Sequence, residues 1–591
     1  MSPVAGPKSS LHAWSKGSDQ TRLAILGRRG ARPTRREERA YREYASDEQR
    51  RRAGCPGGPG GQFILVGALR PVPGSSTFLR RVLIYLHRWL GIAGSLLFIC
   101  WFVSGIVLMY AGMPALTDDE RLGGAPPLDL SRATVGVSEA AVQAGFTPSR
   151  ILVGMHGDRA VYRFAGGGGW TLAYADTGEL ADGLSAEAAV ALVRRFMPEH
   201  AHTATYDMLL RAPDQWTLQS LAFFPLHRVR MHDDADTVVY VSDRTAEPVM
   251  RTTRASRRWA YAGAVLHWLY FTPIRAQAAL WSDLVIWLSV LGCVLCLSGV
   301  VWGLWRLSVS GVYRLRGGVS HSPYAGLMRW HHYGGLAFGL VTFTWVFSGG
   351  LSMEPWSWHP GTAPTRLQRQ AVTGGAPRLG PLTVSQLRAG AAAIATAFEP
   401  KELEVLHFLG EPYLLARDPR PRPDPATLPT TLATLATRSA DQRLVSVLRP
   451  EEGAFERFEN AAFDEVVTTA MPGASVVEAT WLRSYDSYYY DRQDRRRLPV
   501  LRVRYDDPAA TWLYFDPHRG SIARKEERLT RLNRWLYHGF HSLDFPFLYS
   551  KRPLWDLVVI GLSLGGILVS VTSLAQGWRR LRRHAGRFLF S

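Results

Sequence analysis

Cysteine is scarce in this chain of 591 residues, and none lies where a disulfide framework would need it. The four cysteines are Cys55, Cys100, Cys293 and Cys296. Three fall in apolar stretches and one in a basic N-terminal tail, so the long polar segments carry no cysteine pair. Cys293 and Cys296 form a CxxC motif without a following histidine, which excludes c-type haem attachment. We interpret these two residues as packing residues of an apolar helix.

Two further motifs are missing. No GxGxxG opens a helix after a predicted strand, so nothing indicates a flavin or nicotinamide site. No ExxH pair falls in an apolar stretch, so a dinuclear carboxylate metal site is not indicated either.

Acidic residues are absent from two of the three segments that carry the excess positive charge. Residues 1–81 hold 16 Lys and Arg against 6 Asp and Glu, whereas 305–329 hold four Arg and 578–591 hold five Arg without any acid. These three segments account for the whole net charge of +19. The distribution is the positive-inside pattern of a membrane protein, and it argues against nucleic acid as a partner. It predicts cytoplasmic termini and exported segments at roughly 111–281 and 354–553.

Long apolar runs are present, and four of them approach the roughly 20 residues that span a bilayer. They lie at about 83–110, 282–304, 333–353 and 554–577. We predict a membrane-embedded all-α four-helix bundle with two exported α+β domains. The expected order is a basic disordered tail (1–77), transmembrane helix 1 (78–112), exported domain 1 (113–265), an outer histidine segment with transmembrane helix 2 (266–306), a basic cytoplasmic loop (307–328), transmembrane helix 3 (329–355), exported domain 2 (356–533), an outer histidine segment with transmembrane helix 4 (534–578) and a basic cytoplasmic tail (579–591).

Each exported segment mixes helical and strand-like patterns. In the first, we expect helices at 138–144 and 186–196, strands at 150–164 and 170–174, and a hairpin at 238–250. In the second, we expect a helix at 384–398, strands at 498–507 and 511–523, and an exposed proline-rich loop at 417–430. The tyrosine-rich stretch SYDSYYYDR (484–492) is interpreted as a packed loop.

Two similar stretches of the chain each begin with a histidine. HRWLGIAGSLLFICWFVSG begins at His87, and HHYGGLAFGLVTFTWVFSG begins 244 residues later at His331. A second pair of histidines is also repeated next to apolar runs. His267 lies in LHWLYF and His541 in FHSLDF, each shortly before another apolar run. Duplication in a membrane protein often places a cofactor or substrate site between the two halves.

The charge topology sorts these four histidines into two layers. His87 and His331 begin outward-running helices and lie at the same cytoplasmic depth, whereas His267 and His541 precede inward-running helices and lie near the outer face. Helices that face each other across a bundle can supply two imidazole ligands to one haem. We therefore predict two bis-histidine haem groups stacked across the membrane. A lone interfacial histidine is more often an anchor; the duplication of the set favours ligation.

Neighbouring residues leave the assignment open. His332 adjoins His331, and His538 precedes His541 by one helical turn, so either could ligate or could bond a haem propionate. Arginines near the candidate ligands could pair with propionates; they are Arg88, Arg258, Arg329 and Arg534. Histidines without a paired arrangement are interpreted as surface or loop residues; they are His156, His200, His202, His227, His232, His359, His407, His518 and His584.

The chain resembles the PepSY-associated transmembrane family, and within it the inner-membrane ferric-siderophore reductases. The matching text is HRWLG (87–91), SG (104–105), RWHHYGGLAFGL (329–340), WVFSGGLSMEP (345–355), HWLYFTP (267–273) and FHSLDFPFLYSKRPLWDLVV (540–559). Turns within 174–180 and 514–522 look like those of PepSY modules. The resemblance covers about residues 78–583; it is specific at the apolar stretches and weak in the exported segments.

This resemblance implies a protein of the bacterial inner membrane that carries haem b, with PepSY-like domains in the periplasm. The implied activity is one-electron reduction of a ferric siderophore or other ferric chelate, which releases Fe(II) because the chelator binds it far more weakly. Lipid surrounds the helices, and the electron donor on the cytoplasmic side is a quinol or a separate reductase. The alternative is a non-enzymatic PepSY membrane module or a transport component in siderophore or metal uptake.

Overall fold

Four long helices dominate the computed structural model, which describes residues 75–311, 313–315, 318–420, 441–492 and 496–589. They are α2 (Ser75–Leu108), α9 (Ala278–Arg306), α10 (Leu327–Leu351) and α17 (Leu554–Leu589). Each contains a stretch long and apolar enough to cross a membrane, which confirms the four predicted apolar helices. Helix α2 already includes the last residues of the predicted tail 1–77; the rest of that tail lies outside the described residues.

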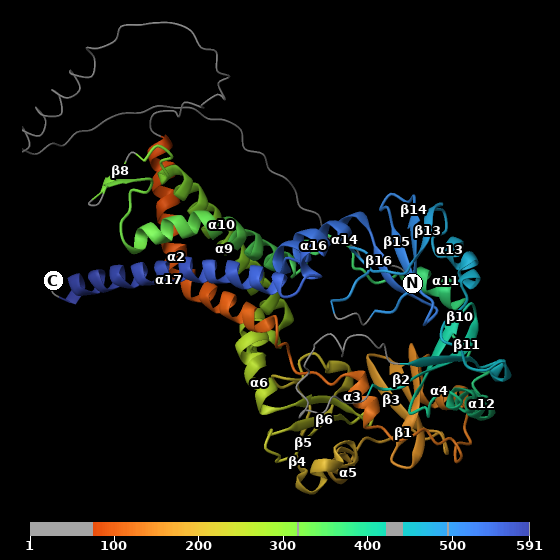
Figure 1. Cartoon of the computed structure of the whole chain (residues 1–591). Coiled ribbons are helices and arrows are strands. Elements are labelled where there is room, and N and C mark those ends of the chain that lie inside the picture. The colour runs from red at the N-terminus through yellow and green to blue at the C-terminus, as the bar shows by residue number, and fades with distance from the viewer. Residues whose placement is uncertain (1–74, 312, 316–317, 421–440, 493–495, 590–591) are drawn as a thin grey trace, which may run out of the picture. The chain divides into compact units, whose positions relative to one another are not determined.

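The four long helices pack against one another (Figure 1). Helix α2 contacts α9 and α17, and α10 contacts the same two helices, so α2 and α10 face each other across the group. Two adjacent glycines of α17 permit the close approach, because a Cβ at Gly565 would overlap the ring of Phe338 and one at Gly566 would overlap Phe102. Small residues at such contacts are typical of helices that pack in a membrane.

Strands from both polar segments form one six-stranded antiparallel sheet, in the order β12-β11-β10-β1-β2-β3. Its strands are β1 (Arg150–His156), β2 (Arg159–Gly166), β3 (Gly169–Tyr174), β10 (Leu403–Phe408), β11 (Glu411–Arg417) and β12 (Gln442–Ser446). The two segments join through β1 and β10, where Val153 pairs with Leu403. The expected strand 150–164 divides into β1 and β2 at a turn in which Gly157 has φ of 67°. The proline-rich loop lies largely outside the described residues.

Each polar segment also contributes a four-stranded antiparallel sheet of its own. The first contains β4 (Thr205–Leu210), β5 (Leu226–Arg230), β6 (Val238–Ser242) and β7 (Pro248–Thr252); the second contains β13 (Val476–Leu482), β14 (Val500–Tyr505), β15 (Trp512–Asp516) and β16 (Ser521–Glu526). Strands β14 and β15 begin 274 residues after β5 and β6, the same offset that separates His267 from His541. These two sheets are therefore repeats of one unit. A short hairpin, β8 (Tyr313–Leu315) with β9 (Gly318–Ser320), follows α9.

Short helices connect and cover these sheets. The predicted helices at 138–144, 186–196 and 384–398 correspond to α4 (Val137–Ala144), α5 (Ala186–Phe196) and α12 (Val384–Ala395). The side chains of Ser185 and Thr383 cap the first turns of α5 and α12 by accepting backbone N–H groups. The remaining helices are α3 (Asp118–Gly123), α6 (Arg254–Ala260), α7 (Leu266–Trp268), α8 (Thr272–Arg275), α11 (Arg366–Thr373), α13 (Asp464–Thr469), α14 (Arg528–Asn533), α15 (Phe540–Ser542) and α16 (Pro546–Tyr549). Single turns are the 3-10 turns η1 (Pro198–Thr203), η2 (Leu221–Phe223), η4 (Pro355–Ser357), η5 (Pro450–Glu452) and η6 (Asn460–Phe463), and the π-helical turns η3 (Tyr261–Val265) and η7 (Arg534–Gly539).

The core beneath the six-stranded sheet draws on both polar segments. Ile151 and Phe164 from the first pack in one cluster with Leu387, Leu403 and Leu414 from the second, all of them buried. A buried ion pair reinforces this junction. Arg121 donates to both oxygens of Glu402 at 2.8 and 2.9 Å, and to Glu247 at 2.8 Å. The shared core joins the two segments, whereas the sequence led us to expect two separate modules.

Candidate cofactor-binding site

A π-helical turn precedes each of the two histidines His267 and His541. Turn η3 ends just before α7, which carries His267, and η7 ends just before α15, which carries His541. Both short helices end on a leucine in the left-handed region, Leu269 with φ of 54° and Leu543 with φ of 48°. That conformation is unfavourable for leucine by about 1 kcal/mol or more, and π-helical turns are rare and concentrate at functional sites. The two halves of the repeat therefore share the same uncommon backbone conformation next to the histidine.

The structure brings the four histidines together in the two pairs that the sequence predicts. His87 of α2 faces His331 of α10 with ring centres 6.1 Å apart, and we name these two residues the first pair. His267 faces His541 with ring centres 6.0 Å apart, and these two form the second pair. Each pair takes one residue from each half of the repeat.

The ring separation matches the geometry of one metal ion held between two imidazoles. With metal–nitrogen bonds of about 2.0 Å and ring centres about 1.1 Å beyond each nitrogen, opposed ligands have centres about 6.2 Å apart. The two observed values, 6.1 and 6.0 Å, lie within about 0.2 Å of that distance. Two imidazoles complete the coordination of haem iron, whose other four ligands belong to the macrocycle. The donor set of each pair therefore fits a haem.

Backbone carbonyls of neighbouring helices orient the first pair. Nδ1 of His87 donates to the carbonyl of Leu295 in α9 at 3.1 Å. Nδ1 of His331 likewise donates to the carbonyl of Val569 in α17 at 3.2 Å, and it lies 3.1 Å from Oγ1 of Thr572. Since a carbonyl can only accept, both hydrogens reside on Nδ1 and each Nε2 keeps its lone pair for a ligand.

The second pair is held by the repeated Ser-Gly motif near the ends of α2 and α10. Nδ1 of His267 donates to the carbonyl of Trp101 at 3.1 Å and lies 3.3 Å from Oγ of Ser104. Nδ1 of His541 donates to the carbonyl of Trp345 at 3.1 Å and lies 3.2 Å from Oγ of Ser348.

The second residue of the Ser-Gly motif is a glycine in both halves because a side chain there would lie against the histidine. A Cβ at Gly105 would lie 3.2 Å from Cε1 of His267, and one at Gly349 would lie 3.4 Å from Cε1 of His541. A larger side chain at either place would press on the imidazole. Burial also lowers the pKa of His267 to about 4, which keeps this imidazole neutral, as ligation requires. Gly105 and Gly349 are separated by the same offset of 244 residues as His87 and His331, which is the signal in the sequence for a shared role.

A cavity of about 560 Å³ opens beside the second pair. Both histidines line it, together with Trp281, Trp345 and Trp555. The indole nitrogen of Trp345 is buried and has no hydrogen-bond partner among the described residues. Sites for cofactors are typically apolar cavities of this size with a few polar groups. The cavity therefore offers the space and the ligands that a haem needs.

The two pairs lie about one hydrocarbon thickness apart. Ser104, which contacts His267, follows His87 by 17 residues along α2, or about 25 Å at 1.5 Å per residue. Aromatic side chains occupy the space between the pairs. Phe102 packs against Trp345 with ring centres 5.9 Å apart, in a buried cluster that also contains Phe98 and Cys296. That cluster bears out the interpretation of the CxxC motif as packing.

The adjacent histidines do not join the pairs. His332 is buried, and both its ring nitrogens are engaged at 2.8 Å, Nδ1 with Oγ of Ser322 and Nε2 with the carbonyl of Gly303. His538 is an exposed residue of η7 whose ring lies against Tyr537. The geometry thus favours His331 over His332 and His541 over His538 as ligands.

The candidate propionate partners differ in their surroundings. Arg88 lies over the ring of Tyr85, Arg329 donates to the carbonyl of Tyr324, and Arg258 is exposed. Arg534 is fully buried and donates to the carbonyls of Ser487 and Asp544, while its Nη1 has no partner among the described residues. A further arginine that the sequence reasoning missed, Arg492, lines the cavity and pairs with Asp544 at 3.3 Å.

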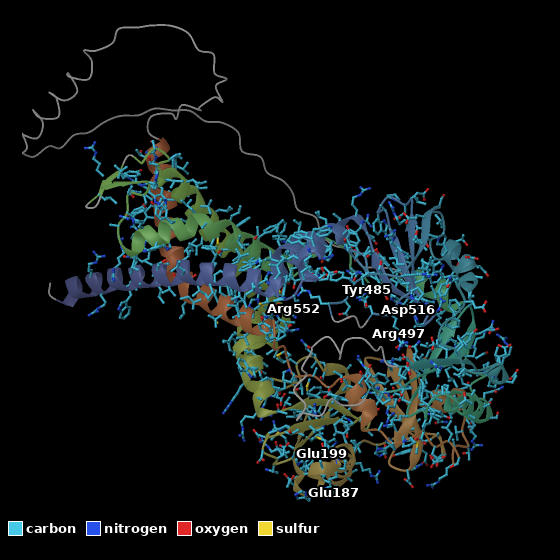
Figure 2. The ribbon with its side chains drawn as sticks, viewed as in Figure 1. Glu187, Glu199, Tyr485, Arg497, Asp516 and Arg552 are labelled. Atoms are coloured by element: carbon cyan, nitrogen blue, oxygen red, sulfur yellow. The ribbon has the colours of Figure 1, made fainter. Side chains whose placement is uncertain are left out.

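Polar contacts fix the segments around the second pair. Gln215 donates to the carbonyl of Tyr270, just after His267, at 2.6 Å. On the other half, Tyr490 donates to Asp544, just after His541, which bears out the packed role expected of the tyrosine-rich stretch. Arg552, labelled in Figure 2, donates from Nε to Asp556 at 2.8 Å, and Tyr110 donates to the same carboxylate at 2.9 Å. These contacts tie α17 to the end of α2.

Three of the remaining histidines are buried, contrary to the expectation of surface or loop positions. His227 is 3% exposed because it lies on β5 between Asp243 and the hydroxyl of Tyr206. His359 and His518 are also buried. Strand β5 reads as an alternating pattern in which a histidine is not distinguishable from a solvent-facing residue, so burial of His227 was not predictable from the sequence.

Neither a protein-family model nor a curated protein sequence matches this chain.

Proposed function

We propose that the chain is a b-type haem protein of the bacterial inner membrane that passes electrons outward and reduces a periplasmic ferric siderophore. The observation that carries the proposal is the pair of opposed imidazole couples, 6.1 and 6.0 Å between ring centres, with all four Nδ1 atoms bonded to backbone carbonyls. The resemblance of the four apolar stretches to ferric-siderophore reductases supports the same function.

The residues of each pair have distinct tasks in this proposal. His87 and His331 would hold a haem near the cytoplasmic face, and His267 and His541 would hold one near the periplasmic face. Bound haem supplies one-electron redox chemistry. The chain supplies orientation, through the carbonyls that fix each ring, and it excludes water with the aromatic cluster around Phe102 and Trp345. Arg492, at the cavity, is placed to pair with a propionate.

The basic segments set the direction of electron flow. Residues 305–329 and 578–591 contain Arg and no acid, so the ends of the helices that carry them face the cytoplasm. The sheet-rich segments 113–265 and 356–533 then lie in the periplasm as PepSY-like domains, beside the second pair. The first pair would then hold a haem on the side of the quinol or reductase that donates electrons, and the second pair would hold one on the side of the ferric chelate. Reduction of Fe(III) to Fe(II) frees the metal without any proton transfer from the chain.

A vesicle experiment tests this function. Liposomes carrying the haem-loaded protein, with a membrane-impermeant reductant inside and a ferric siderophore outside, should form external Fe(II) at least about tenfold faster than vesicles with His541→Ala. An Fe(II)-specific dye in the outer solution provides the measurement. The His538→Ala protein serves as the matched control and should reduce iron at the parental rate.

The same experiment separates the two functions that the sequence leaves open. A protein that carries haem but forms no external Fe(II) would contradict the reductase and would favour a non-enzymatic PepSY module or a transport component.

A further inference from the structure

One facing pair of residues differs in size between the two repeated four-stranded sheets. In the first sheet Arg228 pairs with Tyr240 and Arg230 with Val238; in the second, Arg502 pairs with Tyr514 and Arg504 with Trp512. The register is the same and each residue is displaced by 274 positions. Arginine, tyrosine and arginine recur in both halves, whereas valine in the first half stands where the second half has tryptophan.

In the second half, three arginines enclose the indole of Trp512. The guanidinium carbons of Arg502, Arg504 and Arg531 lie 5.4, 4.9 and 4.4 Å from its ring centre. The ring of Tyr488 meets it edge-on at 5.4 Å. Guanidinium groups within about 6 Å of an indole face attract its electron-rich π system. This half therefore contains a filled aromatic site.

In the first half, the corresponding residues line a cavity of about 130 Å³ that is open on one side. It is lined by Arg228, Arg230, Arg257, Trp216, Tyr240 and Val238, and it also reaches Asp214. Arg257 lies 274 residues before Arg531. Trp216 corresponds to Tyr488, because the backbone N–H of each donates to an aspartate that also accepts from the tyrosine of the paired strand. Because valine is much smaller than tryptophan, the space that the indole fills in one half is left open in the other.

Carboxylates hold the three arginines in place without a ligand. Asp207 accepts from Arg228 at 2.5 Å and from Arg230 at 2.9 Å, and Asp236 accepts from Arg257 at 2.5 Å. Three carboxylates, counting Asp214 at 3.6 Å from Arg228, balance the three guanidinium charges. A ligand therefore need not be an anion. Because N–H donors lie at the edges of a guanidinium group, these bonds occupy edges and leave the planar faces for stacking on an aromatic ring.

We propose that this cavity binds a planar, electron-rich aromatic ring of a small molecule, such as an indole or phenol group, in the place that Trp512 takes in the second half. The cavity lies where the indole of Trp512 lies in the second half, and its volume of about 130 Å³ approaches the roughly 150 Å³ of an enclosed cavity that holds a benzene. The ring of Trp216, which lines the cavity, packs edge-on against Tyr261 at 5.2 Å. Tyr261 begins the π-helical turn that leads to His267. The inference does not rest on haem binding.

A pair of reciprocal variants tests the proposal in the purified full-length protein. Fluorine NMR of 5-fluoroindole at millimolar concentration should show a bound fraction in the parent protein, since a ring of this size with stacking contacts binds with a dissociation constant on the order of 1 mM. The Val238→Trp variant, which copies the second half, should lose that fraction. The Trp512→Val variant, which copies the first half, should bind about twice as much as the parent.

A control compound without an aromatic ring and a second variant make the result decisive. Fluorocyclohexane, which lacks a π face, should bind at least about tenfold more weakly than 5-fluoroindole if the arginine faces carry the affinity. The proposal is overturned if the parent protein and Val238→Trp bind 5-fluoroindole equally. If Val238→Trp does not fold, the Trp512→Val protein decides, and unchanged binding in it overturns the proposal.

Discussion

Changing His541 to Ala is expected to halve the haem content of the purified protein, from two groups per chain to one. His541 supplies one of the two imidazoles of the second pair, and its partner His267 lies 6.0 Å away between ring centres. One remaining axial ligand in a widened cavity holds haem far less tightly, whereas the first pair, about 25 Å along α2, is untouched. The haem-to-protein ratio by pyridine haemochrome absorbance measures the change.

Neighbouring histidines provide the matched controls for this experiment. His538→Ala removes an exposed imidazole one helical turn away and should retain both haem groups. His332→Gln should also retain both, because glutamine can still bond the Ser322 hydroxyl or the Gly303 carbonyl that His332 contacts. Loss of one haem in His538→Ala together with full loading in His541→Ala would reverse the assignment of the ligand.

Adding one methyl group at Gly299 is expected to remove the haem of the first pair. A Cβ at Gly299 would lie 2.5 Å from Cε1 and 2.9 Å from Nδ1 of His87. The imidazole would have to leave the carbonyl of Leu295 that now fixes it at 3.1 Å. Displacing a ligand's hydrogen-bond partner typically costs 10- to 100-fold in metal affinity, so Gly299→Ala should carry about one haem per chain.

Gly335→Ala is the control for that variant. Gly335 is also a glycine of an apolar helix, α10, but its added Cβ would have no neighbour within 4 Å. Alanine favours helix over glycine by about 1 kcal/mol, so this variant should fold as well as the parent and keep both haem groups. Equal haem content in the two alanine variants would show that the ring of His87 is not held as described.

Much of the candidate site could be predicted from the sequence, because it rests on repetition and charge. The constant offset between His87 and His331 predicts that both residues lie at one depth, and the arginine-rich segments predict the direction of the helices. The pairing of His267 with His541 follows from the same two facts. The choice between His331 and His332 could not be predicted, because adjacent residues point about 100° apart on a helix. Whether His331 or His332 faces His87 depends on the rotation of α10 about its axis. Packing of α10 against α9 and α17 decides that rotation.

The sheets were less predictable than the helices. Alternating patterns identified strand-like stretches such as 170–174, but they carry no information about a partner strand 250 residues away. The pairing of Val153 with Leu403 joins the two halves into one sheet, and only tertiary packing selects it. The two π-helical turns were also beyond prediction, since no pattern in YAGAV or RWLYHG distinguishes them from an ordinary helical turn. The difference between Val238 and Trp512 was visible in the sequence, but its meaning required the register of the repeated sheets.

Haem ligation by the four histidines can be measured in a difference absorption spectrum, dithionite-reduced minus oxidised, of the protein purified from haem-replete cells. We expect the bands of bis-histidine haem b at two groups per chain, with half the amplitude in His541→Ala. A folded protein that is colourless, or one whose spectrum is unchanged by replacing His87, His267, His331 and His541, would contradict the claim that these four histidines are haem ligands.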